Sequence, residues 1–186
     1  MKIALVCTDD LSVVLFCKKI LIQLKSKDND IIVLSDQFHN DSNYINTIKS
    51  WGCQHRKVKM YRFLNPLKDL KYIFSLNKIM KEENFDLVFT VTTKPNIYGV
   101  IVANWNNVEK IICGVWGFGI TAIKRKTIKD KMIYLIFKFL YSYSFKKSDK
   151  IWFTNPNYAE SGFIDKEKNK EKIILTKNYV DTDEYS

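Results

Sequence analysis

The sequence predicts an α/β fold: a Rossmann-like, doubly wound parallel sheet of about seven strands. Short apolar runs typical of buried strands alternate with helical patterns from end to end of the 186 residues. No linker rich in proline or glycine interrupts this alternation. A hydrophobic content of 46% is enough for one domain with a substantial core. Apolar strands covered by helices on both faces are typical of parallel sheets.

The first half of the chain supplies four of the expected strands. They lie at residues 2–8, 31–35, 54–60 and 87–91, with helices at 14–25 and 42–51 between them. A long helix begins at Pro66, a residue suited to a first helical turn. We expect its apolar side to consist of Leu67, Leu70, Ile73, Phe74, Leu76, Ile79 and Met80.

The second half continues the alternation. Helices are expected at residues 95–105 and 127–147 and directly after Pro156, and strands at 110–114, 150–154 and 172–176. Residues 1–177 are therefore expected to form one domain. Residues 178–186 are interpreted as the start of a linker between domains.

The glycine distribution argues against a dinucleotide at the first crossover. Four of the six glycines lie between Gly99 and Gly119, and none precedes Gly52. A dinucleotide site needs small residues at the first strand-to-helix turn, so that the backbone can approach phosphate. That turn instead carries Asp9 and Asp10, whose carboxylates repel phosphate. A binding surface is expected further along the sheet.

The composition offers no metal site and no membrane span. The four cysteines, Cys7, Cys17, Cys53 and Cys113, lack C-x-x-C spacing and are interpreted as reduced thiols. His39 and His55 are the only histidines, and neither belongs to a metal-ligand or Ser/His/Asp pattern. No apolar run approaches the ~20 residues that span a bilayer. We expect no metal, no other cofactor and a cytoplasmic location.

The segment Lys94-Pro95-Asn96 is the first candidate binding site. It follows a predicted strand and opens a helix whose free backbone amides favour an anion, and Lys94 adds a positive charge. This predicts an anchor for a phosphate or pyrophosphate. An ordinary polar loop with a solvated lysine fits the spacing equally well. Either way, we expect Lys94 to bury little surface, so that its loss leaves the fold intact.

Two other strand ends carry candidate residues. Gly117 and Gly119 alternate with Trp116 and Phe118, which could make a loop that faces a sugar or a lipid, although a single G-x-G is also an ordinary turn. Asp9 or Asp10 could act as a general base toward an acceptor hydroxyl. Capping of the following helix is the alternative for this pair.

Basic residues are concentrated near the predicted helix at 127–147. Between residues 124 and 150, nine basic residues face two acidic ones, so this segment carries net +7 of the chain's +10. Ile128, Leu135, Ile136 and Phe139 are expected to face the sheet. A basic aromatic helix predicts binding to an anionic membrane surface, whereas a solvated helix and nucleic acid binding are the alternatives. The residues expected to face the membrane are Lys124, Arg125, Lys126, Lys131 and Lys138.

Five stretches in order resemble the N-terminal half of family 4 glycosyltransferases, which have the two-domain GT-B architecture. The resemblance is greatest to bacterial enzymes that extend polyprenyl-diphosphate-linked sugars of surface glycans. Two departures are Cys17, where the family often has arginine, and Tyr179, where it often has glycine. The stretches are 1–6 with Phe16, 64–70, 94–99, 114–119 and 180–185.

The resemblance implies an acceptor-binding half without the nucleotide-sugar domain. The implied partners are a polyprenyl-diphosphate-linked sugar acceptor, bound at Lys94, Pro95, Asn96, Gly117 and Gly119, and the inner face of the plasma membrane. A nucleotide-sugar donor would bind only through a C-terminal domain or a partner subunit, so we expect no transfer by these residues alone. The rival hypothesis is a non-catalytic Rossmann-like module that docks on nucleic acid or a protein through its basic helix; no nucleic acid partner is expected.

Overall fold

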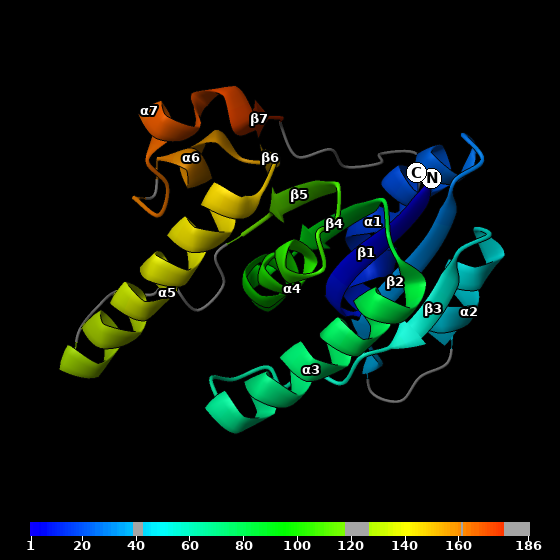
Figure 1. Ribbon diagram of the computed structural model, residues 1–186, viewed down its shortest axis with the longest axis horizontal. Coiled ribbons are helices and arrows are strands. Elements are labelled where there is room, and N and C mark those ends of the chain that lie inside the picture. The colour runs from blue at the N-terminus through cyan, green and yellow to red at the C-terminus, as the bar shows by residue number, and fades with distance from the viewer. Residues whose placement is uncertain (39–42, 118–126, 161, 177–186) are drawn as a thin grey trace, which may run out of the picture.

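The computed structural model describes residues 1–38, 43–117, 127–160 and 162–176. These residues form a seven-stranded sheet in the order β3-β2-β1-β4-β5-β6-β7, in which all neighbouring strands are parallel (Figure 1). The predicted fold class is confirmed. The strands are β1 (Lys2–Asp9), β2 (Asp30–Asp36), β3 (Gln54–Lys57), β4 (Leu87–Val91), β5 (Lys110–Val115), β6 (Lys150–Phe153) and β7 (Ile173–Leu175).

Helices cover both faces of the sheet because successive strand side chains point to opposite sides. Along β1, Ala4 and Val6 join one apolar cluster, whereas Ile3, Leu5 and Cys7 join the other. The first cluster contains side chains of α3 (Pro66–Glu83), α4 (Val100–Trp105) and α5 (Ile128–Lys147). The second contains side chains of α1 (Asp10–Lys25) and α2 (Asn43–Ser50). The short elements are η2 (Pro95–Gly99), α6 (Pro156–Ala159), α7 (Lys166–Asn169) and η4 (Lys170–Lys172).

The chain changes direction within the sheet between β1 and β4. From β1 the chain builds outward through β2 to β3, crosses over through α3 to β4 on the other side of β1, and then proceeds to β7. The carboxyl ends of β1 and β4 therefore diverge into connections on opposite sides. In open α/β sheets, ligands bind at such a switch point.

Local signals explain most element boundaries. Helix α1 begins at Asp10, four residues before the expected start, because the Asp9 side chain caps it. Helix α5 begins after Thr127, which forms a capping box with Asp130. The helix expected at 95–105 opens with the π-helical turn η2.

The expected apolar sides of α3 and α5 are only partly correct. On α3, Tyr72, Leu76, Ile79 and Met80 are buried, but three residues of the expected apolar side are exposed: Leu67, Leu70 and Phe74. On α5 the sheet-facing side chains are Phe137, Tyr141 and Phe145. The residues expected to face the sheet, Ile128, Leu135, Ile136 and Phe139, are all exposed instead.

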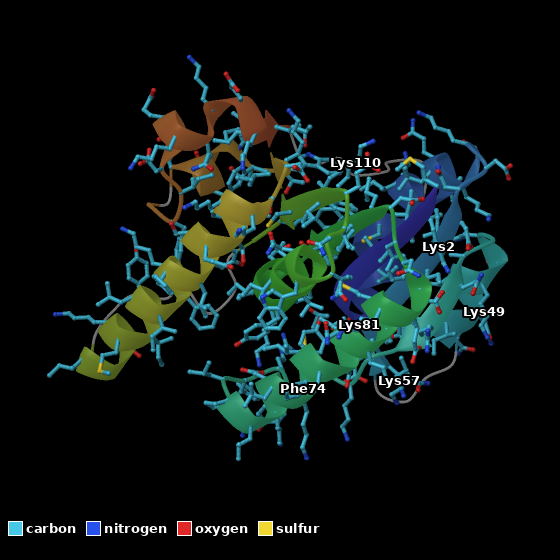
Figure 2. The ribbon with its side chains drawn as sticks, in the orientation of Figure 1. Lys2, Lys49, Lys57, Phe74, Lys81 and Lys110 are labelled. Carbon is cyan, nitrogen blue, oxygen red and sulfur yellow. The ribbon has the colours of Figure 1, made fainter. Side chains whose placement is uncertain are left out.

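This difference has a geometric cause. The N-terminal parts of α3 and α5 extend in the same direction, away from the body of the sheet (Figure 1). Figure 2 marks Phe74 on α3 and shows side chains along both extended ends reaching into open space. Helix periodicity identifies an apolar stripe but not whether a neighbour covers it. No helix in the described ranges is both long and apolar enough to cross a membrane.

Candidate functional site

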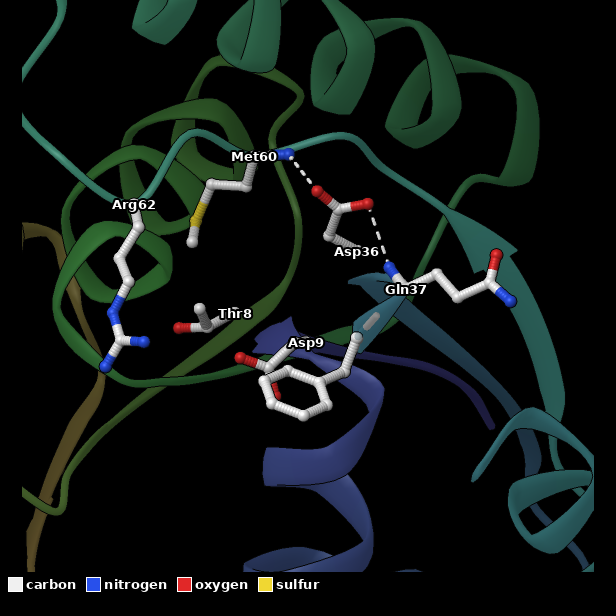
Figure 3. A pocket seen from close by; sticks show the side chains of 7 residues that line it. Thr8, Asp9, Asp36, Gln37, Met60 and Arg62 are labelled. Atoms are coloured by element: carbon white, nitrogen blue, oxygen red, sulfur yellow. Dashed lines mark hydrogen bonds between the residues drawn. The ribbon is translucent and has the colours of Figure 1, made fainter. Parts of the chain in front are cut away.

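A hollow of about 240 Å³ lies at the carboxyl ends of β1 and β2 (Figure 3). Three segments that are distant in sequence meet there: the end of β1, the residues after β2, and the segment between β3 and α3. It adjoins the switch point, where the fold favours ligand binding. The lining residues are Thr8, Asp9, Asp36, Gln37, Phe38, Met60 and Arg62.

The two carboxylates of the hollow are fixed by backbone amides. Asp9 accepts a hydrogen bond from the Ser12 amide at 2.7 Å and so caps α1. Asp36 accepts from the Gln37 amide at 2.8 Å and the Met60 amide at 2.9 Å, which ties β2 to the segment after β3. Each carboxylate oxygen keeps a further lone pair for a ligand hydroxyl.

Among the described residues, Arg62 is the one cation that lines the hollow. Its side chain is exposed and makes no ion pair or hydrogen bond to any described residue. In Figure 3 the guanidinium lies on the Thr8 side of the hollow, whereas Asp36 and Gln37 lie on the other side. A planar guanidinium suits bidentate recognition of phosphate or carboxylate.

Thr8 and Thr92 join β1 and β4 at the switch point. Their hydroxyl oxygens lie 2.5 Å apart. Thr92 has φ of 74°, a left-handed conformation that is rare for a β-branched residue. Strained backbone of this kind is concentrated at functional sites. The Thr8 and Thr92 hydroxyls are thus held on the side of the hollow where Arg62 lies.

Asp10, the first residue of α1, directly follows Asp9 and is completely buried. Its Oδ1 accepts from the Phe38 amide at 2.7 Å, which connects α1 to the exit of β2, while its Oδ2 has no partner among the described atoms. The structure therefore gives Asp9 and Asp10 the structural roles that were the alternative to catalysis. A role for either as general base stays a prediction.

Lys94 lies in a different environment from the one expected. Its side chain is 7% exposed and forms an ion pair with Asp69 of α3, whose side chain is 5% exposed. The same ammonium donates to the carbonyl oxygens of Tyr61 at 2.7 Å and Phe63 at 2.8 Å. Tyr98 donates a further hydrogen bond to Asp69 at 3.2 Å, and burial together with this carboxylate raises the pKa of Tyr98.

The expectation that Lys94 buries little surface is therefore wrong, and so is the alternative of a solvated loop lysine. An ammonium group has three protons to donate, and three acceptors take them here. A direct contact between Lys94 and a phosphate would require this arrangement to break. Direct acceptor binding by Lys94 stays untested, and the geometry supports an indirect role.

Pro95 and Asn96 are also buried in the opening turn of η2. The Asn96 amide donates to the Gly114 carbonyl at 2.8 Å, and its Oδ1 accepts from the Thr90 hydroxyl at 2.8 Å. Asn96 therefore links β4 to β5 just below the carboxyl edge. It shapes this edge, and contact with an acceptor stays a prediction for both residues.

Trp116 and Gly117 follow β5 at the same edge. The Trp116 ring packs edge-on against Phe16, Phe89 and Trp152, with centroids 6.1–6.4 Å apart. The proposed sugar-facing loop thus begins at an aromatic cluster on the α1 side of the sheet. Gly119 and Phe118 lie outside the described residues, and the role of Gly117 stays a prediction.

The basic helix is partly described. Lys131 and Lys138 are exposed on α5, as a membrane-binding role requires. Lys124, Arg125 and Lys126 lie outside the described residues, as does His39. His55 hydrogen-bonds Ser35 at 3.0 Å, and burial lowers its pKa. Within the described ranges no cluster of potential metal ligands occurs.

Arg62 and Thr92 lie in segments that follow predicted strands, but no sequence motif gives either residue a role. Arg62 lies in an irregular segment with no motif, so only its place beside β1 reveals it. The left-handed backbone of Thr92 has no sequence signal, because a threonine rarely adopts it. A doubly wound parallel sheet with a polar hollow beside its switch point defines the class of this protein as a Rossmann-like α/β domain.

Sequence comparison gives the family. Residues 2–155 match the family described as glycosyl transferase 4-like, and the chain belongs to it. An N,N'-diacetylbacillosaminyl-diphospho-undecaprenol alpha-1,3-N-acetylgalactosaminyltransferase of Campylobacter jejuni is 28% identical over 149 residues, which cover 78% of this chain and 38% of that protein. A UDP-Gal:alpha-D-GlcNAc-diphosphoundecaprenol alpha-1,3-galactosyltransferase of Escherichia coli is 28% identical over 125 residues, covering 67% and 31%. The chain therefore spans well under half the length of these relatives.

Solved structures support the fold. A glycosyltransferase from Rickettsia africae matches with a TM-score of 0.62 and 16% identity, over 100% of this chain and 45% of that one. A UDP-GlcNAc 2-epimerase from Neisseria meningitidis bound to UDP-GlcNAc matches with a TM-score of 0.63 and 12% identity, over 94% and 46%. Transferases and epimerases thus share this half, so the structural likeness shows the fold and not the reaction.

Proposed function

We propose that this chain is the acceptor-binding half of a glycosyltransferase. The enzyme would move a sugar from a nucleotide-sugar donor to a polyprenyl-diphosphate-linked or polysaccharide acceptor in the synthesis of a cell-surface glycan. The observation that carries the proposal is the family match over residues 2–155. The names of both relatives specify a sugar linked to undecaprenol through a diphosphate.

The hollow beside the switch point supports this proposal chemically. Asp9 and Asp36 offer acceptor oxygens to sugar hydroxyls, and the Phe38 side chain contributes an aromatic surface. Arg62 and Thr8 offer donors to a phosphate on the side of the hollow away from Asp36 and Gln37 (Figure 3). A sugar attached to a diphosphate presents these two kinds of group next to each other.

Catalysis requires a second substrate. Transfer needs donor and acceptor held together in near-attack geometry. We expect the nucleotide sugar to bind to another domain or subunit, because the relatives are much longer than the matched segment. The 186 residues alone should therefore bind acceptor but transfer no sugar, and turnover by the purified chain would refute this expectation.

A peripheral location at the inner face of the plasma membrane fits the surfaces of α3 and α5. Leu67 and Phe74 on α3 are 74% and 68% exposed, and Phe139 on α5 is 72% exposed. Exposed lysines lie near these apolar residues on both helices, including Lys71 on α3 and Lys138 on α5. Apolar residues flanked by lysines fit the headgroup region of an anionic bilayer.

The same surface argues against the rival function. A nucleic acid interface is dominated by phosphate contacts from basic and polar groups. Burying the apolar residues of α3 and α5 against a phosphate backbone would give them no favourable partner. A membrane therefore explains the exposed apolar residues together with the charge, whereas nucleic acid explains the charge alone.

Acceptor binding is the experiment that tests the proposed function. Farnesyl diphospho-N-acetylglucosamine, a short-chain acceptor, is titrated into the purified chain by calorimetry, with UDP-N-acetylglucosamine as the comparison. We expect the lipid-linked sugar to bind more tightly than the nucleotide sugar. Binding of the nucleotide sugar alone would contradict an acceptor-binding half.

Vesicle binding tests the membrane location separately. The chain is sedimented with phosphatidylcholine vesicles that contain or lack phosphatidylglycerol. Changing Lys124, Lys131 and Lys138 to Gln should weaken binding to anionic vesicles about a hundredfold, since each surface lysine contributes about 1 kcal/mol. Leu67→Gln with Phe74→Gln should also weaken it.

Trp105→Gln is the matched control for the apolar change. Trp105 is also exposed and apolar, but it lies at the C-terminal end of α4, away from these two surfaces. Unchanged vesicle binding by the lysine and apolar variants would exclude α3 and α5 as the membrane contact. Tight binding to duplex DNA with none to vesicles would favour the rival function.

A further inference from the structure

We infer that Arg62 binds the diphosphate of the acceptor and that Lys94 is its positioning residue. Lys94 acts through the segment 61–63, which its buried ammonium holds in place from behind. This inference rests on the proposed function. It replaces a direct contact between Lys94 and the ligand with an indirect one.

Hydrogen bonds from Lys94 hold the backbone of segment 61–63. Lys94 donates to the Tyr61 and Phe63 carbonyls, one on each side of Arg62. Residues 61–64 make no backbone-to-backbone hydrogen bond to any other described residue. Their side chains are exposed, and the Tyr61 ring also contacts the Lys68 ammonium of α3, 3.7 Å from the ring centroid. The Lys94 ammonium is therefore the group that holds the backbone of this segment by hydrogen bonds.

The second step is the rigidity of the group that holds it. Asp69 on α3 pairs with the ammonium, and Tyr98 of η2 donates to the same carboxylate at 3.2 Å. Both members of the ion pair are nearly enclosed. A buried, hydrogen-bonded ion pair is costly to rearrange, so it fixes one geometry. The backbone position of Arg62 is fixed in turn, because the Tyr61 and Phe63 carbonyls on either side of it are bonded to Lys94.

The third step is the chemistry on Arg62's side of the hollow. Its guanidinium has no partner among the described residues and lies toward Thr8 (Figure 3). The Thr8 and Thr92 hydroxyls meet at 2.5 Å on that side, beside the strained backbone of Thr92. A cation and hydroxyl donors together favour an anion with several oxygens. Asp36, on the other side, would repel the anion and suit the attached sugar, whereas Asp9 lies between Thr8 and Phe38 (Figure 3).

A purely structural role for Lys94 makes a different prediction. If the ion pair only stabilises the fold, its removal lowers stability and changes ligand binding independently of Arg62. If Lys94 contacts the ligand directly, removing Lys94 and removing Arg62 should cost affinity additively. If Lys94 acts through Arg62, the two losses should overlap, because residues acting on one interaction are not additive.

A double-mutant cycle separates these cases. Arg62→Gln removes the guanidinium and keeps the ion pair. Lys94→Met with Asp69→Leu removes the pair without leaving an unpaired buried charge. Each is titrated by calorimetry with farnesyl diphospho-N-acetylglucosamine, and Lys78→Gln, an exposed change on α3, controls for the loss of one positive charge.

We expect Arg62→Gln to weaken binding about ten- to a hundredfold, as for the loss of a charge-assisted hydrogen bond. The Lys94→Met/Asp69→Leu variant should weaken it by a similar factor, and adding Arg62→Gln to it should cause little further loss. Lys78→Gln should bind as the wild type does. Additive losses, or an Arg62→Gln variant that binds as tightly as the wild type, would overturn the inference.

Two further measurements make each outcome decisive. Amide hydrogen exchange without ligand should speed up in residues 60–65 of the Lys94→Met/Asp69→Leu variant, and unchanged exchange there would refute the positioning role. UDP supplies a diphosphate without lipid: binding of UDP with the same Arg62 dependence would assign the site to a nucleotide instead. If the wild type binds no lipid-linked sugar, the proposed function is refuted. If the wild type and the Arg62→Gln variant bind it with equal affinity, only this inference is refuted.

Discussion

Breaking the Lys94–Asp69 pair on one side should destabilise the protein strongly. In Lys94→Met the Asp69 carboxylate, 5% exposed, keeps only the Tyr98 hydroxyl as a described side-chain partner, and the Tyr61 and Phe63 carbonyls lose their donor. Removing one partner of a buried ion pair costs about 3–5 kcal/mol. For a domain of this size that corresponds to a fall in Tm of about 6–20 °C.

The matched variant isolates the cause. Lys94→Met with Asp69→Leu removes both charges, and such replacements by apolar residues are often neutral. We therefore expect the pair of changes to restore most of the stability that Lys94→Met loses. Urea unfolding followed by circular dichroism measures both free energies of unfolding. A Lys94→Met variant within about 1 kcal/mol of the wild type would refute the reasoning, because exposed lysines behave in that way.

Three other changes test the edge of the sheet. Asn96→Leu should cost about 2–4 kcal/mol of unfolding free energy, because it leaves the Gly114 carbonyl and the Thr90 hydroxyl without this partner; equal Tm values would contradict the link between β4 and β5. Gly114→Ala should cost about 1–3 kcal/mol in urea unfolding, since its Cβ would lie 2.9 Å from a Phe89 ring carbon. Burial lowers the pKa of His55 in the folded protein. As the pH falls, the unfolded chain therefore protonates its His55 near pH 6.5, before the folded protein does. The free energy of unfolding should decrease as the pH drops below that value. His55→Gln should flatten this slope between pH 7 and the folded-state pKa, and an unchanged slope would assign it to other groups.

The fold was predictable because its signals are local. Buried parallel strands such as β1 and β4 are short apolar runs, and Pro66 and Thr127 mark helix starts by their own chemistry. The sequence predicted no strand order, and the structure supplies it: β3-β2-β1-β4-β5-β6-β7. What failed was the assignment of the apolar stripes of α3 and α5 to the core, because periodicity does not reveal where a helix extends beyond its neighbours.

The site was predictable only as a region. The rule that ligands bind at the carboxyl edge predicts a site at the carboxyl ends of the strands, and the hollow lies at those of β1 and β2. The sequence shows Lys94 as a cation near a helix start but does not show Asp69, 25 residues earlier, or the carbonyls of Tyr61 and Phe63. Lys94, the residue that the sequence singles out, is buried in an ion pair with Asp69. Arg62, which belongs to no motif, is exposed and lines the hollow.

The most direct test of the account is to locate the bound acceptor. Amide chemical shifts of the labelled chain are followed by NMR as farnesyl diphospho-N-acetylglucosamine is added. We predict that the largest changes occur at Thr8, Arg62 and Thr92, around the switch point between β1 and β4. Changes confined to the opposite edge of the sheet, near the start of β1 and the end of α4, would contradict the account.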